Sequence, residues 1–418
     1  MSLIIDTNIL LDFPQIIQDF EEEELVILTD VLRELDGLKQ SVNQDTSYKA
    51  RRAAVVISRN LEKLQWNDSY EKDNIPVDQK LLLVTEKLNA TLMTNDVYLK
   101  IKAILRGLKT KGYSGFEDYT GIRTIKLATD ENGFHPDLEY ILQNHKLLDE
   151  QRPLREGEYV IIKDLSSPIK TKYDDDYSVL FTGVNEKGKI VEIPDYKNVI
   201  QNEWITKIVP LNPEQNCLFH ALNNKDKTII YAGGKFGTGK SFILNNYALQ
   251  EFERGHIDKI VYVPNNSYTE NTTDLGALPG ELLEKTTGLI GPLLDLIGID
   301  KITDMMNTNQ LEIVPMNYIR GRSFKNAIII VNEAQNLTED HVKLLIARCD
   351  EGTRIFFDGD IKQADSAIFR NKNGLRLLTS LSNSPTFSDI FAMVKLTTIE
   401  RSKTANAASY LDEITGNI

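Results

Sequence analysis

The sequence has few cysteines and no long hydrophobic run. Its 418 residues include only Cys217 and Cys349, too few for a disulfide framework, which fits a reducing cytoplasm. No uncharged apolar stretch is long enough to cross a bilayer, and the N-terminus lacks the basic flank of a secretory signal. The five histidines show no metal-ligand spacing, so we expect no zinc site. A soluble, cytoplasmic protein is expected.

The sequence also has fewer basic than acidic residues. The formal net charge is −13, with 48 Lys and Arg against 61 Asp and Glu. This balance argues against a generally basic surface for nucleic acid, although it leaves room for a local basic channel.

The chain is longer than one hydrophobic core usually serves, so we expect two or three domains. Strand-like runs such as LIID, ELVILTD and ATLMTND alternate with amphipathic segments, which predicts α/β architecture at both ends with β-rich segments between them. The expected divisions are an N-terminal α/β/α domain at 1–119, a connector at 120–152, a small β-rich module at 153–209 and a C-terminal phosphate-loop domain at 210–418.

A glycine-rich loop follows the strand-like run 228–231 and fits the pattern G-x-x-x-x-G-K-[ST]. Glycines let backbone N–H groups surround a phosphate, the lysine neutralises phosphate oxygens, and the serine offers a hydroxyl to Mg²⁺. A chance match in a turn is the alternative, but the strand before and the helix-like run after favour nucleotide binding. The predicted binding residues are Gly234, Gly237, Thr238, Gly239, Lys240 and Ser241.

Polar residues follow two later strand-like runs in the order that an ATP-hydrolysing motor needs. Asn332 and Glu333 end the run AIIIV, where Asn332 would meet the Mg²⁺ ion and Glu333 would act as general base on the attacking water. Asp360 and Gln363 follow the run RIFFDG and would sense the γ-phosphate.

Two more residues complete the predicted nucleotide site. Gln215 precedes the loop strand, and its amide could read the adenine edge. Arg401 follows the run MVKLTTI and could stabilise charge on the transferred phosphoryl group, although a surface ion pair is the plainer explanation of a lone arginine.

Together, the motifs from about Leu211 onward resemble the PhoH-like ATPases, relatives of superfamily-one helicases. Segments 274–281, 284–285, 318–322 and 373–375 resemble strings particular to that family. The resemblance implies a RecA-like P-loop NTPase fold that uses ATP and Mg²⁺. It also implies a ring, expected to be a hexamer, in which Arg348 or Arg401 reaches the nucleotide of a neighbouring subunit.

Two positions depart from the family pattern. Asn332 stands where the family has Asp, and Val263 stands where it usually has Arg. An amide still accepts hydrogen bonds from metal-bound water but contributes no charge, so we expect weaker metal binding and slower ATP hydrolysis.

The N-terminal region carries a second candidate site, built from dispersed carboxylates. Asp6 and Asp96 each follow a strand-like run, so both are expected at the carboxyl edge of a parallel sheet. Glu34 and Asp78 could complete an all-oxygen site for Mg²⁺ or Mn²⁺. Taken singly, these residues are more simply explained as a turn residue, a helix cap and a solvated helix charge.

The strings around these carboxylates resemble the PIN nuclease domain, namely Asp6-Thr7-Asn8-Ile9-Leu10, Glu34-Leu35, Asp78 and Thr94-Asn95-Asp96. Segments 36–39 and 50–52 resemble its PhoH-fused subtype. The resemblance implies that Asp6, Glu34, Asp78 and Asp96 hold divalent metal for RNA phosphodiester cleavage. Nearby cations could attract a phosphate backbone, or could be ordinary solvated helix faces. These cations are Lys49, Arg51, Arg52, Lys100, Lys102, Arg106, Lys109 and Lys111.

The sequence therefore predicts an ATP-dependent RNA helicase or translocase coupled to a metal-dependent ribonuclease, with single-stranded or structured RNA as partner. Two alternatives stay open. One is an RNA-binding scaffold with a slow motor, which Asn332 motivates. The other is a nuclease in which ATP only assembles the ring.

Overall fold

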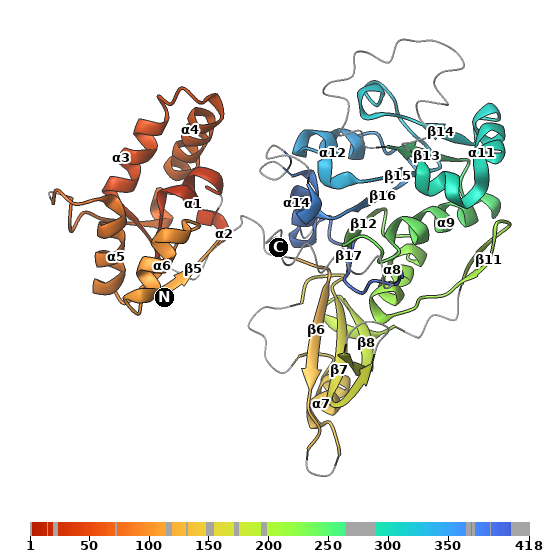
Figure 1. Cartoon of the computed structure of the whole chain (residues 1–418), viewed down its shortest axis with the longest axis horizontal. Helices are drawn as coiled ribbons and strands as arrows, with labels where there is room; N and C mark the ends of the chain where they lie inside the picture. The colour runs from red at the N-terminus through yellow and green to blue at the C-terminus, as the bar shows by residue number, and fades with distance from the viewer. Residues whose placement is uncertain are drawn as a thin grey trace. The chain divides into compact units, whose positions relative to one another are not determined.

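A computed structural model of the chain describes residues 2–14, 16–19, 24–71, 73–113, 119–130, 133–147, 154–170, 175–193, 199–264, 290–364, 369, 373–384 and 386–402. The chain divides into two compact units, Met1–Asp118 and Tyr119–Ile418, which are described separately (Figure 1). None of the helices in the described ranges is long and apolar enough to span a membrane.

The N-terminal unit is built on a five-stranded parallel sheet of order β3-β2-β1-β4-β5. Its strands are β1 (Ser2–Ile5), β2 (Glu24–Leu28), β3 (Leu64–Asn67), β4 (Thr91–Met93) and β5 (Lys109–Lys111). Its helices are α1 (Thr7–Asp12), α2 (Ile16–Asp19), α3 (Thr29–Leu38), α4 (Gln44–Arg59), α5 (Val77–Lys87) and α6 (Val97–Leu105), with a 3₁₀ turn η1 at Leu61–Lys63.

The apolar strand runs explain this arrangement. β1 and β2 carry almost uninterrupted Leu, Ile and Val, which is typical of parallel strands covered by helices on both faces. Ile4 and Ile5 are fully buried, and Leu81 of α5 and Leu99 of α6 pack into the same core. The polar residues that follow these strands are thereby brought to one edge of the sheet.

The second unit contains a six-stranded parallel sheet of order β14-β13-β15-β16-β12-β17 (Figure 1). Its strands are β12 (Ile229–Gly234), β13 (Lys259–Val263), β14 (Leu311–Ile313), β15 (Ala327–Val331), β16 (Arg354–Gly359) and β17 (Phe391–Leu396). Its helices are α8 (Pro213–Asn223), α9 (Lys240–Glu253), α11 (Gly291–Asn307), α12 (Glu339–Ile346) and α14 (Gly374–Thr379). Short 3₁₀ turns are η3 (Met316–Tyr318), η4 (Ala334–Asn336), η5 (Ile361–Gln363) and η6 (Ser380–Asn383).

Alternate residues of each strand face opposite layers of helices. Ile330 and Phe356 lie in one core with residues of α8, α9 and α11. Ile329 and Phe357 lie in the other core with residues of α12 and α14. The predicted α/β architecture of both ends is confirmed, and the second unit is a three-layer sandwich whose sheet is covered on both faces.

A smaller sheet of order β6-β7-β8-β9 packs against the large one within the second unit. Its strands are β6 (Ile122–Leu127), β7 (Tyr159–Lys170), β8 (Asp175–Glu186) and β9 (Lys189–Glu192), and a separate pair is formed by β10 (Ile200–Asn202) and β11 (Ile205–Ile208). β6 pairs in parallel with β7, while β8 runs antiparallel to both of its neighbours. β6 and helix α7 (Pro136–Asn144) lie in the stretch 120–152 that we expected as a connector, so this stretch contains regular structure.

The small sheet meets the large one at Gly121. A Cβ atom added there would lie 1.7 Å from the carbonyl oxygen of Met393 in β17, and the Gly121 φ of +72° is in the left-handed region. The N–H of Lys395 donates to the Thr120 carbonyl at 2.9 Å. The chain thus enters the second unit directly over the edge strand β17.

Candidate nucleotide and acidic sites

The glycine-rich loop joins β12 to α9 and has a backbone that only glycine adopts easily. Gly234, Gly237 and Gly239 have φ angles of +123°, +76° and +93°. A Cβ at Gly234 would lie 1.9 Å from the Leu396 carbonyl oxygen, so no other residue fits there. Thr238 is buried, and its hydroxyl donates to the Lys235 carbonyl at 2.9 Å. The loop is therefore a fixed cradle at the N-terminus of a helix, the arrangement that binds phosphate.

Lys240 and Ser241 converge on a carboxylate from the neighbouring strand. The Lys240 ammonium donates to the Lys235 carbonyl at 2.9 Å and lies 3.9 Å from the Asp358 carboxylate. The Ser241 hydroxyl donates to the other oxygen of Asp358. Burial raises the pKa of Asp358, while the charge of Lys240 opposes that rise.

Asp358 was not among the predicted site residues. Its contacts depend on β16 lying beside β12, with Asp358 opposite Ala232, and sheet order is not visible in the sequence. The available signal was a charged residue inside an otherwise apolar strand run.

The end of β15 presents the predicted hydrolytic residues. Asn332 is buried, whereas Glu333 is exposed and has a left-handed backbone with φ of 51°. Such a conformation costs a non-glycine residue energy and is concentrated at functional sites. The side-chain amide of Gln335 donates to the Glu333 carboxylate, and the side-chain oxygen of Gln335 accepts from the Asp360 N–H at 3.3 Å.

Asp360 and Gln363 lie together after β16. Asp360 is buried, its carboxylate accepts from the N–H of Lys362, and its carbonyl accepts from the N–H of Gln363 at 2.8 Å. Gln335, which the sequence interpretation did not single out, connects this turn to the end of β15. The ends of β12, β15 and β16 therefore present the loop, Glu333 and Asp360 at one edge of the sheet.

Gln215 lies against the phosphate loop. Its amide donates to the Thr238 carbonyl at 3.0 Å and accepts from the Leu211 N–H at 2.9 Å. The amide thereby bridges α8 and the loop, and it retains one further donor and one further acceptor.

The segment after β17 brings Arg401 to the loop. The Glu400 N–H donates to the Gly237 carbonyl at 2.9 Å, and the Glu400 carboxylate accepts from Asn212 at 2.8 Å. A Cβ placed on Gly237 would lie 3.2 Å from the Arg401 side chain. Arg348 is placed elsewhere, at the end of α12, where its guanidinium donates to the Arg322 carbonyl at 3.2 Å.

Asp6 and Asp96 lie at the ends of β1 and β4, where Ile5 pairs with Met93. One oxygen of Asp6 accepts from the hydroxyl of Thr94 and the amide of Asn8, each at 2.6 Å. The Thr94 hydroxyl also accepts from the Asp96 N–H at 3.0 Å.

The other two predicted carboxylates lie close enough to affect Asp6. Burial is the largest cause that raises the pKa of Asp6, to about 6, and the charges of Asp78 and Glu34 add to it. The Glu34 carboxylate accepts from the Thr7 hydroxyl, next to Asp6 in the chain. Asp78 is half exposed, 3.2 Å from the ammonium of Lys102.

This cluster is not a closed metal cage. No group of three or more His, Cys, Asp or Glu side chains within the described ranges is arranged to hold a metal ion. The charges of Asp78 and Glu34 nevertheless add to the rise in the pKa of Asp6, so a cation bound there would relieve repulsion between carboxylates. Mg²⁺ usually keeps several waters and needs only one or two protein carboxylates, so these residues suit it.

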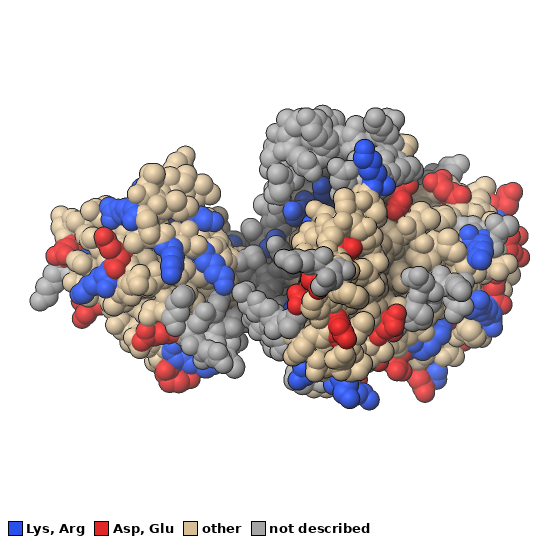
Figure 2. All heavy atoms as spheres, turned by 90° about the horizontal axis from the view of Figure 1, so that it is seen from below, with Lys and Arg blue, Asp and Glu red and all other residues tan. Residues whose placement is uncertain are grey.

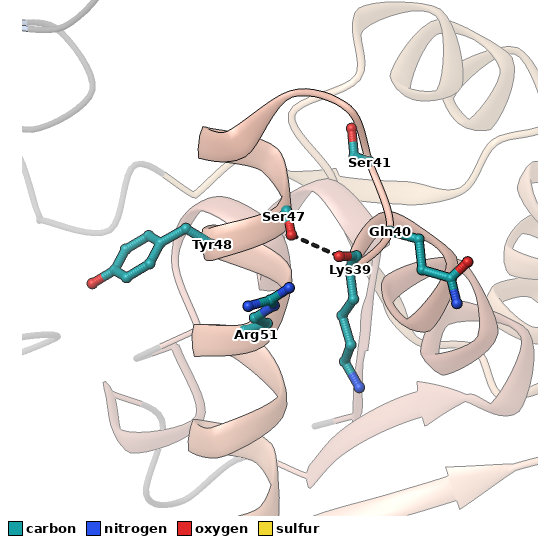
Figure 3. A pocket seen from close by; sticks show the side chains of 6 residues that line it. All are labelled: Lys39, Gln40, Ser41, Ser47, Tyr48 and Arg51. Atoms are coloured by element: carbon teal, nitrogen blue, oxygen red, sulfur yellow. Dashed lines mark hydrogen bonds between the residues drawn. The ribbon is translucent and has the colours of Figure 1, made fainter.

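A surface pocket of about 450 Å³ lies where α3 ends and α4 begins (Figure 3). Its lining residues are Lys39, Gln40, Ser41, Ser47, Tyr48 and Arg51. Figure 3 shows Arg51 on α4 and Lys39 on the segment that faces it. The Lys39 ammonium lies 2.9 Å from the Asp36 carboxylate. Figure 2 shows several Lys and Arg side chains on the visible face of the N-terminal unit, mixed with acidic ones. Lys49 pairs with Asp12 at 2.9 Å.

Comparison with known proteins matches both units to described families. The family model for PhoH-like proteins matches residues 207–410, and that for the PIN domain matches residues 3–114. The chain joins a PIN domain to a PhoH-like domain. Protein PhoH2 of Bacillus subtilis (strain 168) is 26% identical across 98% of this chain and 99% of that protein, and protein PhoH2 of Thermobispora bispora is 24% identical across 97% and 94%. A PhoH-like protein of Synechocystis sp. is 32% identical over 40% of this chain and 51% of its own length.

These matches cover the two sites described above. The PIN match includes Asp6, Glu34, Asp78 and Asp96, and the PhoH match includes the phosphate loop and Arg401. In the PhoH-like domain, the family-like segments 274–281 and 284–285 fall outside the described residues. The family-like segment 373–375 opens α14, where the Asn373 amide donates to the Gln335 carbonyl at 2.9 Å. This contact links the start of α14 to the residues at the end of β15.

Proposed function

We propose that the chain is an ATP-dependent RNA helicase or translocase coupled to a divalent-metal-dependent ribonuclease. The observation that carries the proposal is the convergence of the phosphate loop, Asp358 and Glu333 at one sheet edge. Lys240 and Ser241 contact Asp358, and the charge of Glu333 acts on Asp358 as well. A phosphate-binding loop with its lysine and serine, beside a carboxylate able to orient water, is the kind of arrangement that phosphoryl transfer to water uses.

In the PhoH-like domain, loop N–H groups and Lys240 would hold the β- and γ-phosphates. Ser241, and Asn332 through water, would hold Mg²⁺, which when bound neutralises phosphate charge. Glu333 would orient and deprotonate the attacking water, and Arg401 would stabilise charge on the transferred group. The remaining predicted contacts are Gln215 with the adenine, and Asp360 and Gln363 with the γ-phosphate.

In the PIN domain, Asp6 and Asp96 would be the nearest ligands of Mg²⁺ or Mn²⁺, with Glu34 and Asp78 acting directly or through water. The metal when bound would activate water and stabilise charge on a phosphodiester. Lys39 and Arg51 at the pocket offer charges for the RNA backbone, and the exposed ring of Tyr48 offers a stacking surface for a base.

The proposal includes a cytoplasmic homo-oligomer, a hexameric ring in which the motor feeds RNA to the acidic site. Either Arg401 or Arg348 would then reach a neighbour's nucleotide. Mass measurement of the full chain with and without Mg²⁺ and ATP tests this part separately, since a monomer under both conditions would remove the ring.

Comparing ATP turnover with and without RNA separates the proposal from its alternatives. We expect RNA-stimulated turnover that Lys240→Ala abolishes, because the phosphate charge is left uncompensated. Lys343→Ala, at an exposed α12 position, is the matched control and should leave turnover unchanged. Absence of turnover in the wild type would favour the scaffold for which Asn332 is the motivating observation.

RNA cleavage is tested by Asp96→Asn, with Glu62→Gln at an exposed position of the same unit as control. We expect Asp96→Asn to remove Mn²⁺-dependent cleavage and leave ATP turnover within about twofold, because the two sites lie in separate units. Cleavage that persists in Asp96→Asn and in Asp6→Asn would show that these carboxylates do not form the nuclease site.

A further inference from the structure

Asn332 and Asp358 lie at equivalent positions along two neighbouring chains of the sheet. β15 and β16 run parallel with Val331 opposite Phe357, so Asp358 is the next residue of β16 and Asn332 is the residue that directly follows β15. Ile330 and Phe356, two residues earlier on each strand, lie in the same core as α9. Asp358 faces that layer too, as its contacts with Lys240 and Ser241 at the start of α9 show. The Asn332 N–H donates to the Val263 carbonyl at 3.1 Å, which continues the ladder of β15 by one residue.

Asp358 is a buried carboxylate that contacts both polar side chains at the start of α9. It is 3% exposed, lies between β12 and β15 in the sheet, and touches both Lys240 and Ser241. Burying a carboxylate carries a desolvation cost, which Lys240 offsets in part within the described residues and which a divalent cation would offset further. If Lys240 turns to a bound phosphate, Asp358 stays in contact with the Ser241 hydroxyl, where its charge can offset that of a divalent cation.

We propose that Asp358 supplies, from β16, the carboxylate for the nucleotide-bound divalent cation that Asn332 does not supply from β15. The inference rests on the proposed nucleotide site. Asp358 acts as a positioning residue, since it orients the Ser241 hydroxyl and the waters of the cation. In the family pattern the carboxylate stands at position 332, after β15. Here it stands at position 358 in the neighbouring strand β16, so the net charge around the cation is the same.

Binding of a fluorescent ATP analogue to the full chain, titrated with Mg²⁺, tests this inference without relying on turnover. We expect Asp358→Asn to raise the Mg²⁺ concentration at half-effect by about tenfold or more, the usual result of losing a group that supports a metal ligand. Affinity in EDTA should stay within about threefold, because Lys240 and the loop are retained. Asn332→Asp combined with Asp358→Asn should restore most of the Mg²⁺ dependence.

The outcomes separate this inference from the function on which it rests. If the wild type binds no nucleotide, the proposed function falls. If nucleotide binds but Asp358→Asn leaves the Mg²⁺ midpoint unchanged, or the double variant shows no rescue, Asp358 is only a counter-ion for Lys240 and the inference is wrong.

Asn332→Asp alone provides a second test that does not depend on the stability of Asp358→Asn. With Asp358 already in place, we expect the single change to shift the Mg²⁺ midpoint by less than about threefold. If Asn332→Asp instead lowered the Mg²⁺ midpoint by about tenfold, the wild-type site would lack a carboxylate, and the inference would be wrong.

Discussion

Asp6 is buried at the end of β1, with Glu34 and Asp78 close enough to repel its negative charge. Folding raises the pKa of Asp6 to about 6, so the folded unit holds the proton more tightly than the unfolded chain does. The stability from this proton is fully present below about pH 4 and is lost as the pH rises through about 6.

We therefore expect wild type to lose stability relative to Asp6→Asn as the pH rises. A shift of about two pKa units corresponds to about 3 kcal/mol between pH 4 and 7.5 without divalent metal. Urea unfolding followed by Trp66 fluorescence, in a Trp204→Phe background, measures this unit alone because the chain has two tryptophans, one in each unit. Parallel pH profiles for the two proteins would contradict the assigned pKa.

At the scale of single residues, sequence patterns predicted which side chains lie at strand ends, but not all of their contacts. Asp6 and Asp96 meet through Thr94, as expected for neighbouring parallel strands. The contact of Ser241 with Asp358 was not predictable, because residues 117 positions apart are joined by sheet order alone.

Among the elements, the junction between the small sheet and β17 depends on a glycine. Gly121→Ala would place a methyl group on the Met393 carbonyl as well as strain a backbone with positive φ. Gly188→Ala is the matched control, because Gly188 also has positive φ, at +77°, but has nothing within 4 Å.

We expect Gly188→Ala to cost about 1 kcal/mol, the strain alone, and Gly121→Ala to cost about 3 kcal/mol or more. Urea unfolding followed by Trp204 fluorescence in a Trp66→Phe background checks both. If both variants lost the same free energy of unfolding, the contact between Gly121 and Met393 would not contribute to the stability of the junction.

Element types were largely predictable, because apolar runs without interruption indicate strands covered on both faces. ELVILTD became β2, and ATLMTND became β4 with its polar end. The strand β6 was missed within 120–152, because Arg123, Thr124 and Lys126 interrupt its apolar residues, and its partner β7 lies beyond a helix.

For the whole molecule, the division into two units predicts separate responses to ligands. Mg²⁺ with ATP should raise the stability reported by Trp204 by about 2.7 kcal/mol at a hundredfold excess over the dissociation constant, and leave that reported by Trp66 unchanged. The two single-tryptophan variants, Trp66→Phe and Trp204→Phe, allow each transition to be followed in denaturant. A shift of the Trp66 transition by ATP would show that the units unfold together.

The order of strands in the large sheet also has a consequence for biosynthesis. β12, which leads into the phosphate loop, pairs with β16 and β17 among the described strands, so Ile229 meets Ile355, 126 residues later in the chain. At roughly 5–20 residues per second on the ribosome, β12 waits about 6–25 s without a sheet partner. During that interval the backbone N–H and C=O groups of β12 have no sheet partner, and its apolar side chains are uncovered, so the nascent chain can aggregate. We therefore expect chaperones to be needed until β16 has been made.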